Sequence, residues 1–293
     1  MHRQFGGIEN ANAEQHFDRD SAVLSSLRSA GSAHLVFRSR ETQTRVERAY
    51  QAGCLRLRFP RTENRGDAPC AVLINTAGGV AGGDRLDQQI DWKAGTTATV
   101  TTQAAEKIYR AIAATSRIST QLTVAKGASA EWLPQETILF DGCRLKREAK
   151  IILDEDVTFL GVEALVLGRA AMGETVRRAM LRDRMRIWRG GKLVYADALA
   201  LNGDVDTLMR RAAVGHGARS LAVLVHASSE AQSLLNPVRD VLNAAQGRVA
   251  ASCWNGLLAV RLLAPDGETL RHDIAAALSV LRQGQPLPRV WRC

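Results

Sequence analysis

The stretches GTTATVTTQ (residues 95–103) and GASAEWLPQ (residues 127–135) follow one pattern, with a glycine, an alanine, an apolar residue and a glutamine at matching positions. They begin 32 residues apart, and DVTFLGVE (156–163) follows at a similar step without the glycine. Repeated turn-and-strand units stack side by side, because one unit alone cannot bury its apolar face. The repeat therefore predicts stacked hairpins of one kind that share a core.

Alternation of apolar and polar residues continues on both sides of this repeat. CLRLRF (54–59) and RISTQLTV (117–124) alternate with a period of two, which is typical of strands with one buried face. MRIWRGGKLVY (185–195) has two alternating arms around Gly190-Gly191, which indicates a β-hairpin. No segment of helical periodicity separates these strands, which argues against a βαβ sheet. The sequence thus predicts a mainly β fold, an elongated body of stacked antiparallel strands and hairpins.

The last quarter of the chain changes to helical periodicity. Apolar residues recur at helical spacing near 229–246 and near 269–283, with Pro237 inside the first segment. We expect two C-terminal helices there, with a kink or a break at Pro237. Residues 1–30 are polar and poorly patterned, and we expect them to be loosely ordered. Residues 31–293 are predicted to form a single β-rich domain, since no low-complexity linker divides them.

The composition is that of a globular protein with a basic surface. The 293 residues include 46% hydrophobic residues and carry a formal net charge of +9, with arginine far more frequent than lysine. A basic surface predicts acidic partners, either proteins or nucleic acids. One candidate surface is a stripe of Arg178, Arg182, Arg184 and Arg186, which share one face of a predicted strand.

Several features of the sequence predict a cytoplasmic protein. Its five cysteines are isolated from one another, and an odd number does not suit a secreted disulfide framework. The first twenty residues lack the apolar segment of a signal peptide. No apolar run approaches the roughly 20 residues that cross a bilayer. We therefore expect a cytoplasmic chain that does not bind membranes.

The stretch INTAGGVAGGDRL (74–86) places four glycines in six positions before an aspartate. A phosphate-binding loop would need a helix after the glycines and a basic residue at its end. Here a strand pattern follows, and Asp84 would repel a phosphate. Paired glycines instead allow positive φ angles and the close approach of another chain segment. A tight corner, in which Asn75 and Asp84 bond to local backbone N–H groups, is therefore favoured over a nucleotide site.

Four stretches in a fixed order resemble one protein family. They are NTAGGVAGGDRL (75–86), TTQAAEKIYR (101–110), LPQETILFDGCRL (133–145) and FLGVEALVLGRAAMGE (159–174). In this order and at this spacing they resemble the urease accessory proteins called UreD or UreH, over about residues 33 to 200 and more loosely beyond. The motif positions singled out are Asn75, Gly78, Gly79, Gly82, Gly83, Gln103, Lys107, Tyr109, Pro134, Gln135, Phe140, Gly168, Arg169, Gly173 and Glu174.

The resemblance implies a scaffold rather than an enzyme. Proteins of this family take part in assembling the urease nickel centre. They bind a helical accessory protein of the UreF type, which recruits a nickel-carrying GTPase of the UreG type, and the complex docks on urease apoprotein. The implied fold is mainly β with a pair of helices, without catalytic residues or a tightly bound cofactor. We expect the helical partner to contact the apolar faces of the two C-terminal helices; the alternative is that this helix pair covers a sheet of the chain itself.

Two acids are candidates for a transient nickel path. A protein that passes nickel on needs weak ligands such as carboxylates, because imidazole and thiolate hold the metal tightly. The six histidines are not paired at storage-site spacing. Asp84 and Glu163, the latter within an apolar run, could line a polar path through the interior. The alternative is that Glu163 forms an ion pair with an arginine such as Arg169.

Two other classes of function stay open at this point. A basic β domain that binds nucleic acid would fit the charge, although aromatic residues are few and do not interleave with basic ones as in RNA-binding modules. A nucleotide-binding protein that uses the glycine stretch is less favoured, because of Asp84 and the strand that follows. Hydrolase motifs such as G-x-S-x-G and H-E-x-x-H do not occur.

Overall fold

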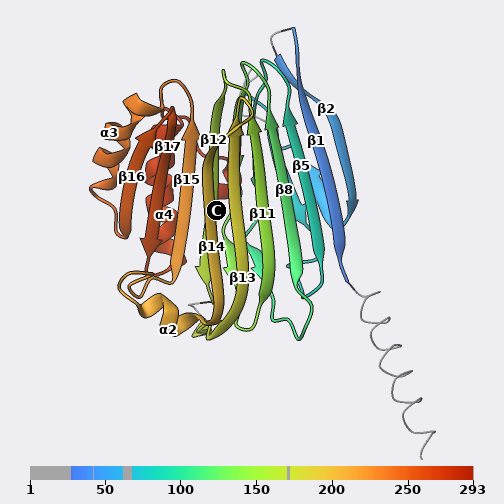
Figure 1. The fold of residues 1–293 in the computed structure, drawn as a ribbon. Helices are drawn as coiled ribbons and strands as arrows, with labels where there is room; N and C mark the ends of the chain where they lie inside the picture. Colours follow the sequence, from blue (N-terminus) through green and yellow to red (C-terminus); the bar gives the residue numbers. More distant parts are fainter. Residues whose placement is uncertain (1–27, 42, 62–67, 170–171, 293) are drawn as a thin grey trace, which may run out of the picture.

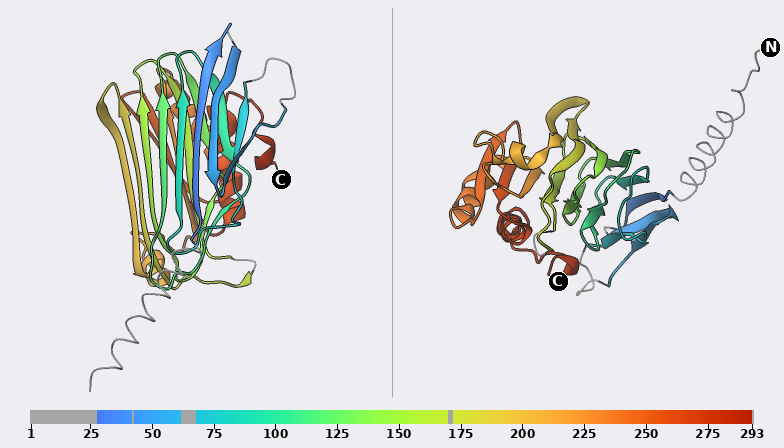
Figure 2. Two further views of the ribbon diagram at one scale, coloured as in Figure 1. Left: turned by 90° about the vertical axis from the view of Figure 1, so that its right-hand side faces the viewer. Right: turned by 90° about the horizontal axis from the view of Figure 1, so that it is seen from below.

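The fold consists of two β-sheets that lie face to face, with helices against the outer side of one of them (Figures 1 and 2). The computed structural model describes residues 28–292 except 42, 62–67 and 170–171. The predicted mainly β fold class is confirmed. The loosely ordered segment 1–30 falls mostly outside the described residues, and the single domain over 31–293 stays a prediction.

Sheet A has the strand order β14-β13-β11-β8-β5-β1-β2, and sheet B the order β16-β17-β15-β12-β9-β6-β4-β3. Two short strands extend sheet B beside β12. The strands of sheet A are β1 (Ala30–Arg40), β2 (Gln43–Gly53), β5 (Arg85–Trp92), β8 (Ser116–Val124), β11 (Arg144–Leu153), β13 (Arg178–Arg189) and β14 (Lys192–Asp204). Those of sheet B are β3 (Leu55–Arg58), β4 (Cys70–Asn75), β6 (Thr97–Thr102), β9 (Ser129–Leu133), β12 (Thr158–Leu167), β15 (Ser220–Ala227), β16 (Arg248–Trp254) and β17 (Leu257–Ala264), with the short β7 (Glu106–Ile108) and β10 (Thr137–Leu139).

In its central part the chain alternates between the two sheets, with β5, β8 and β11 in sheet A and β6, β9 and β12 in sheet B. Successive strands of each sheet pair in parallel, with Leu86 opposite Ile118 in sheet A and Thr97 opposite Ser129 in sheet B. Both pairings join residues 32 positions apart, which is the step of the sequence repeat. The stacked units are therefore present, and each unit is a strand of sheet A followed by a strand of sheet B.

The antiparallel hairpins predicted for this central part are wrong. Period-two alternation shows that a strand has one buried face, but it does not reveal the strand's hydrogen-bonding neighbour. Turns such as 93–96 and 125–128 lead the chain across the core, so consecutive strands face each other instead of pairing. The next strand of the same sheet then runs in the same direction. The strand in the opposite sheet thus serves as the crossover that parallel strands require.

Antiparallel pairing occurs toward the ends of the sheets, and the hairpin predicted around Gly190-Gly191 is confirmed. These two glycines have φ angles of 53° and 78°. Asn255 and Gly256 join β16 to β17 with φ angles of 47° and 69°. Positive φ at both central residues is what a two-residue hairpin turn needs to match the twist of its strands.

The two predicted C-terminal helices are present as α3 (Ala231–Leu242) and α4 (Gly267–Leu281). A short helix that the sequence analysis did not predict, α2 (Val205–Arg210), follows β14. Helix α3 continues through Pro237, so the expected break does not occur there. Asp266 caps α4, because its side chain accepts a hydrogen bond of 2.8 Å from the N–H of Thr269.

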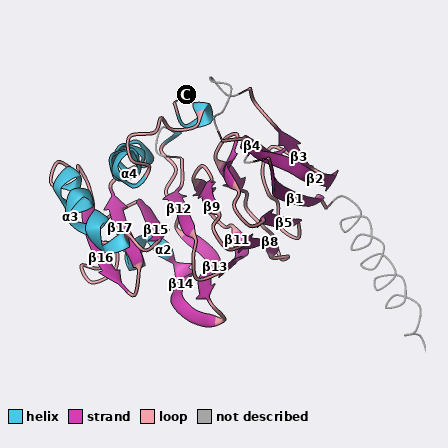
Figure 3. Ribbon diagram, turned by 90° about the horizontal axis from the view of Figure 1, so that it is seen from above, coloured by secondary structure: helices cyan, strands magenta, loops and turns pink. Residues whose placement is uncertain are grey.

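Helices α3 and α4 cover one half of the outer face of sheet B (Figure 3). Leu235 and Val238 of α3 and Ile274 and Leu278 of α4 are buried against that face, which contributes Leu224 to the same cluster. The predicted docking of a helical partner on these apolar faces is therefore wrong, since the chain itself buries them. An amphipathic pattern alone does not tell a helix that packs internally from one that binds a partner.

The core between the sheets is apolar and enclosed. Phe37 and Trp92 lie with their ring centroids 5.9 Å apart, and Leu122, Ile151 and Phe159 are also almost completely buried. Each belongs to the cluster that both sheets share, so the two sheets depend on one another for burial. Among the described residues, no helix combines the length and the hydrophobicity needed to span a membrane.

Candidate functional site at the motif end

The four motif stretches come together at one end of the molecule. Strands β4, β6, β9 and β12 run parallel in sheet B, so their carboxyl ends lie along the same edge. From that edge the chain returns to sheet A through the segments 76–84, 103–115, 134–143 and 168–177. We call these four segments the motif end, which lies at the same end of the molecule as α2 (Figure 1).

Backbone hydrogen bonds join the four segments of the motif end into a ladder. The N–H of Val80 donates to the carbonyl of Lys107 (2.7 Å), and the N–H of Tyr109 donates to the carbonyl of Val80 (2.9 Å). Strand β7 of the second segment pairs with β10 of the third, and β10 pairs with β12. The N–H of Gly168 then donates to the carbonyl of Leu139 (2.8 Å). Each segment is therefore held in register with the next.

Side chains from the four segments stack on one another in the order of the segments, and neighbours in the stack are about one repeat apart in the sequence. The edge of the Tyr109 ring meets the Phe140 ring with centroids 5.2 Å apart, and the Arg169 guanidinium carbon lies 4.3 Å from the Phe140 centroid. The Tyr109 hydroxyl donates to the carbonyl of Gly78 (2.8 Å). A Cβ atom at Gly79 would lie 2.4 Å from the Tyr109 ring, so this glycine leaves the space that the ring occupies. We call these residues the ring stack.

Two motif carboxylates hold neighbouring segments together. Asp141 accepts hydrogen bonds from the backbone N–H groups of Arg177 and Arg178 (2.8 and 2.9 Å). Glu174 accepts from the guanidinium of Arg169 (2.8 Å) and from the N–H of Asp141 (3.2 Å). Burial acts to raise the pKa of both acids. Hydrogen bonds from the backbone of Arg178 and Arg177 outweigh it and lower the pKa of Asp141, and the hydrogen bond from Arg169 likewise lowers the pKa of Glu174. Both acids thus stabilise the motif end in their ionised form.

The glycine stretch forms the corner that its sequence predicts. The side-chain oxygen of Asn75 accepts from the N–H of Ala77 (3.0 Å), and the Asp84 carboxylate accepts from the N–H groups of Ala81 (2.7 Å) and Ser29 (2.8 Å). Strand β5, not a helix, begins after Asp84. The arrangement supports the structural interpretation over a nucleotide site, since a phosphate would have no helix N-terminus to face.

Glu106 is a residue of this site that the sequence analysis did not single out. The amide nitrogen of Asn75 lies 3.1 and 3.2 Å from its two carboxylate oxygens. Burial raises the pKa of Glu106 to about 7, although the hydrogen bond from Asn75 acts in the opposite direction. The only signal in the sequence is its place within EKIYR (106–110), which does not distinguish a buried acid from an exposed one.

Glu163 lies between the sheets and pairs with Arg147, so the alternative of an ion pair with an arginine is confirmed, whereas Arg169 as its partner is wrong. The Arg147 guanidinium lies 2.7 Å from a Glu163 oxygen and 2.5 Å from an oxygen of Asp183 on β13. Arg169 instead lies at the motif end and pairs with Glu174. Burial raises the pKa of Glu163, and the charge of Arg147 opposes that rise. We call Arg147, Glu163 and Asp183 the buried charge cluster.

Asp84 and Glu163 are held by separate partners and share no hydrogen bond in the described structure. Within the described residues, no three His, Cys, Asp or Glu side chains are grouped so that they could hold a metal ion. The nickel path through these two acids therefore stays a prediction.

The remaining motif residues shape the motif end in different ways. Gln135 is buried and its side-chain oxygen accepts from Arg271 of α4 (2.6 Å), whereas Gln103 and Lys107 are exposed. A Cβ atom at Gly82 would lie 2.6 Å from Ala111, so this glycine also permits a close approach. The other positions within or beside these turns are Pro134, which is buried, and Gly83, Gly168 and Gly173, which have positive φ angles.

Comparison with known proteins places the chain among urease accessory proteins. A family model described as UreD urease accessory protein matches residues 29–292. A protein named urease accessory protein UreD from Rhizobium leguminosarum bv. viciae is 45% identical over 264 residues, which are 90% of this chain and 95% of that protein. The proteins of the same name from Azorhizobium caulinodans and Chelativorans sp. are 45% and 42% identical, over 90% and 94% of this chain and 96% and 99% of the relatives.

A substitution at Gly79 tests the ring stack. We expect Gly79→Ala to lower the free energy of unfolding by about 2–4 kcal/mol, because the new methyl group would overlap the Tyr109 ring at a positive φ angle. Gly78→Ala is the matched control, since Gly78 also has a positive φ but has open space around it, and it should cost about 1–2 kcal/mol. Urea unfolding of the two variants measures the difference. Equal losses would show that Gly79 does not make room for the ring.

The raised pKa of Glu106 predicts a pH-dependent stability. The folded state binds the Glu106 proton more tightly than the unfolded state, so the free energy of unfolding falls as the pH rises from the ordinary glutamate pKa of 4.5 to about 7. We expect the wild type to lose roughly 3 kcal/mol more than Glu106→Gln over this range, since the other acids, Glu163 included, titrate in both proteins. Unfolding curves between these pH values check it, with exposed Glu148→Gln as the control that keeps the wild-type slope. Parallel slopes for wild type and Glu106→Gln would contradict the assignment.

Proposed function

Because the chain belongs to the UreD family of urease accessory proteins, we propose that it is a non-catalytic scaffold for assembly of the urease nickel centre. Membership of the family supports a role in urease assembly. In the proposed role the chain acts in the cytoplasm and connects urease apoprotein to a helical accessory protein of the UreF type and a nickel-carrying GTPase of the UreG type. Nickel is the cargo of this complex and not a resident cofactor of the chain.

The observation that carries this proposal is the construction of the motif end. Its four segments are fixed to one another by backbone hydrogen bonds and by the ring stack, and two of its acids are engaged in holding those segments. The same end presents apolar side chains to solvent, since Ile112 is fully exposed and Met172 is 73% exposed. Large apolar side chains on an ordered surface indicate contact with another protein. These features favour a docking surface.

Loss of the exposed apolar side chains tests the scaffold role. We expect urease activity to be low in cells that express urease and its other accessory proteins without this chain, and to be restored by the wild type. Ile112→Asp combined with Met172→Asp should lower the restored activity about tenfold or more, because a charge in an apolar contact weakens binding.

Leu193→Asp is the matched control for this test. Leu193 is 53% exposed and follows the Gly190-Gly191 turn at the opposite end of the strands, so its charge should leave urease activation unchanged. Activation that does not need the chain would refute the scaffold role. Equal activity of the double variant and the Leu193 variant would refute the motif end as the docking surface.

We also propose that Glu163 lies on the route that nickel takes through the chain, with Asp84 beside the corner at the motif end. The buried charge cluster supports this, because two carboxyl groups there share one arginine inside an otherwise apolar core. A carboxylate in such surroundings attracts a cation yet holds nickel weakly enough to release it.

Amide substitutions test the nickel route. Asp84→Asn together with Glu163→Gln should lower urease activation at limiting nickel by about tenfold and have a smaller effect at saturating nickel, because weak ligands matter most when the metal is scarce. Asp183→Asn is the control, since it also removes an acid from Arg147 but leaves Glu163 ionisable. Thermal unfolding of each variant shows whether it folds. Unchanged activation by the folded double variant at limiting nickel would exclude this route.

A further inference from the structure

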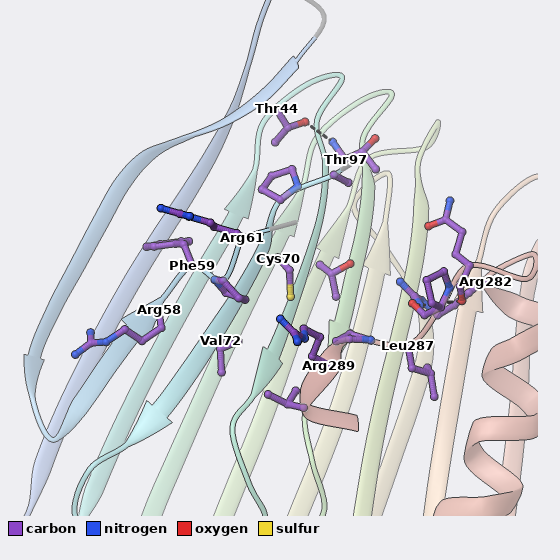
Figure 4. Close-up of a pocket in the computed structure, with 18 of the residues that line it drawn as sticks. Thr44, Arg58, Phe59, Arg61, Cys70, Val72, Thr97, Arg282, Leu287 and Arg289 are labelled. Carbon is purple, nitrogen blue, oxygen red and sulfur yellow. Dashed lines mark hydrogen bonds between the residues drawn. The ribbon is translucent and has the colours of Figure 1, made fainter. Parts of the chain in front are cut away.

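A groove of about 1440 Å³ lies on the half of the outer face of sheet B that α3 and α4 leave uncovered (Figure 4). Strands β4 and β6 form its floor with Cys70, Val72 and Thr97. One wall is the segment 58–61 after β3 together with the start of β2, and the other wall is the C-terminal segment 285–292. The groove is therefore built from parts of the chain that lie far apart in the sequence.

Among the described residues, the charged side chains that line the groove are all positive. No aspartate or glutamate lines it, whereas arginines come from both walls. Arg45 donates to the side chain of Gln43, and Arg58 donates to the carbonyl of Leu57, so neither guanidinium is neutralised by a described acid. The arginines that line the groove are Arg45, Arg58, Arg61, Arg282, Arg289 and Arg292.

Apolar side chains also line the groove between the arginines. Val72 and Ile74 point outward from β4, opposite to Leu73, which packs into the core between the sheets. Leu287 faces them from the C-terminal wall, and Phe59, which is 43% exposed, lies on the other side. Apolar side chains between basic walls are complementary to a chain segment that carries both carboxylates and apolar side chains.

The C-terminal wall is held in place by contacts with sheet B. Arg282 makes two hydrogen bonds to the carboxylate of Glu131 on β9 (2.9 and 3.0 Å). The indole N–H of Trp291 donates to the carbonyl of Leu133 (2.9 Å), and the ring is 6% exposed. The side-chain amide of Gln135 donates to the carbonyl of Val290 (3.2 Å). These contacts preform this wall, which lowers the cost of ordering it when a ligand binds.

We propose that this groove binds an acidic, amphipathic segment of a partner protein, with carboxylates on Arg45 and Arg58 and apolar side chains on Ile74 and Leu287. The volume exceeds the roughly 300–1,000 Å³ of small-molecule sites, which favours a chain segment. Nucleic acid fits less well, because the aliphatic floor offers few rings on which bases could stack. This inference rests on the proposed scaffold role in one respect: it takes the ligand of the groove to be a protein.

Binding of a defined peptide to the full-length chain tests the proposal. The probe is a short fluorescein-labelled peptide of Glu, Leu and Ala, compared with the same peptide carrying Gln for Glu and with a single-stranded oligonucleotide. We expect anisotropy to show the acidic peptide binding at least about tenfold more tightly than either comparison. Tighter binding of the oligonucleotide, or equal binding of the Gln peptide, would overturn the proposal.

Charge reversal in the groove identifies the surface. Arg45→Glu with Arg58→Glu should weaken binding of the acidic peptide about tenfold or more. The matched control is Arg182→Glu with Arg186→Glu, which makes the same change in net charge on the exposed face of β13 in sheet A. This control should alter the affinity less than about twofold, since it changes only the long-range field. Equal weakening by the two double variants would overturn the proposal.

Cys70 provides a second readout on the groove floor, where its sulfur faces the groove (Figure 4). Saturating peptide should slow alkylation of Cys70 at least about fivefold, as judged by mass spectrometry, while Cys253 on β16 keeps its rate. Peptide that binds without protecting Cys70 would place the site elsewhere. Because these assays need no urease, a failed binding test refutes the groove alone, and a failed activation test refutes the scaffold role alone.

Discussion

Parallel pairing between strands 32 residues apart is the constraint on which the rest of the molecule depends. Thr97 pairs with Ser129 in sheet B as Leu86 pairs with Ile118 in sheet A, so each two-strand unit is laid on the next in one register. A shift of one residue would turn every core side chain toward solvent. Because the core between the sheets is largely apolar, burial fixes the register, and the register in turn stacks the connecting segments at one end.

That stacking explains how motifs spread over a hundred residues of sequence form one site. Gly79, Tyr109, Phe140 and Arg169 belong to successive units and therefore meet at the same edge. The buried charge cluster is the exception to an otherwise apolar interior. It joins strand β11, which supplies Arg147, to β12 and β13, and removing Arg147 would leave two buried acids without their cation.

Two surfaces with different chemistry result from this construction. The motif end is closed by its own hydrogen bonds and exposes apolar side chains, whereas the groove on sheet B is lined by arginines over an aliphatic floor. The first lies where the strands of sheet B end, and the second lies on the outer face of the same sheet. The proposed scaffold role would need separate surfaces of this kind, because different chemistry favours different partners.

The amino-acid sequence by itself determined the strands, the Gly190-Gly191 hairpin, the C-terminal helices, the 32-residue repeat and the corner made by Asn75 and Asp84, because alternation, helical spacing and turn chemistry are local. Only the tertiary structure decided that consecutive strands lie in opposite sheets, that Glu163 pairs with Arg147 and that Glu106 is partly buried beside Asn75. It also decided that the apolar faces of α3 and α4 cover sheet B. Each of these outcomes depends on which surfaces meet across the core, and one-dimensional patterns do not record the identity of a neighbour.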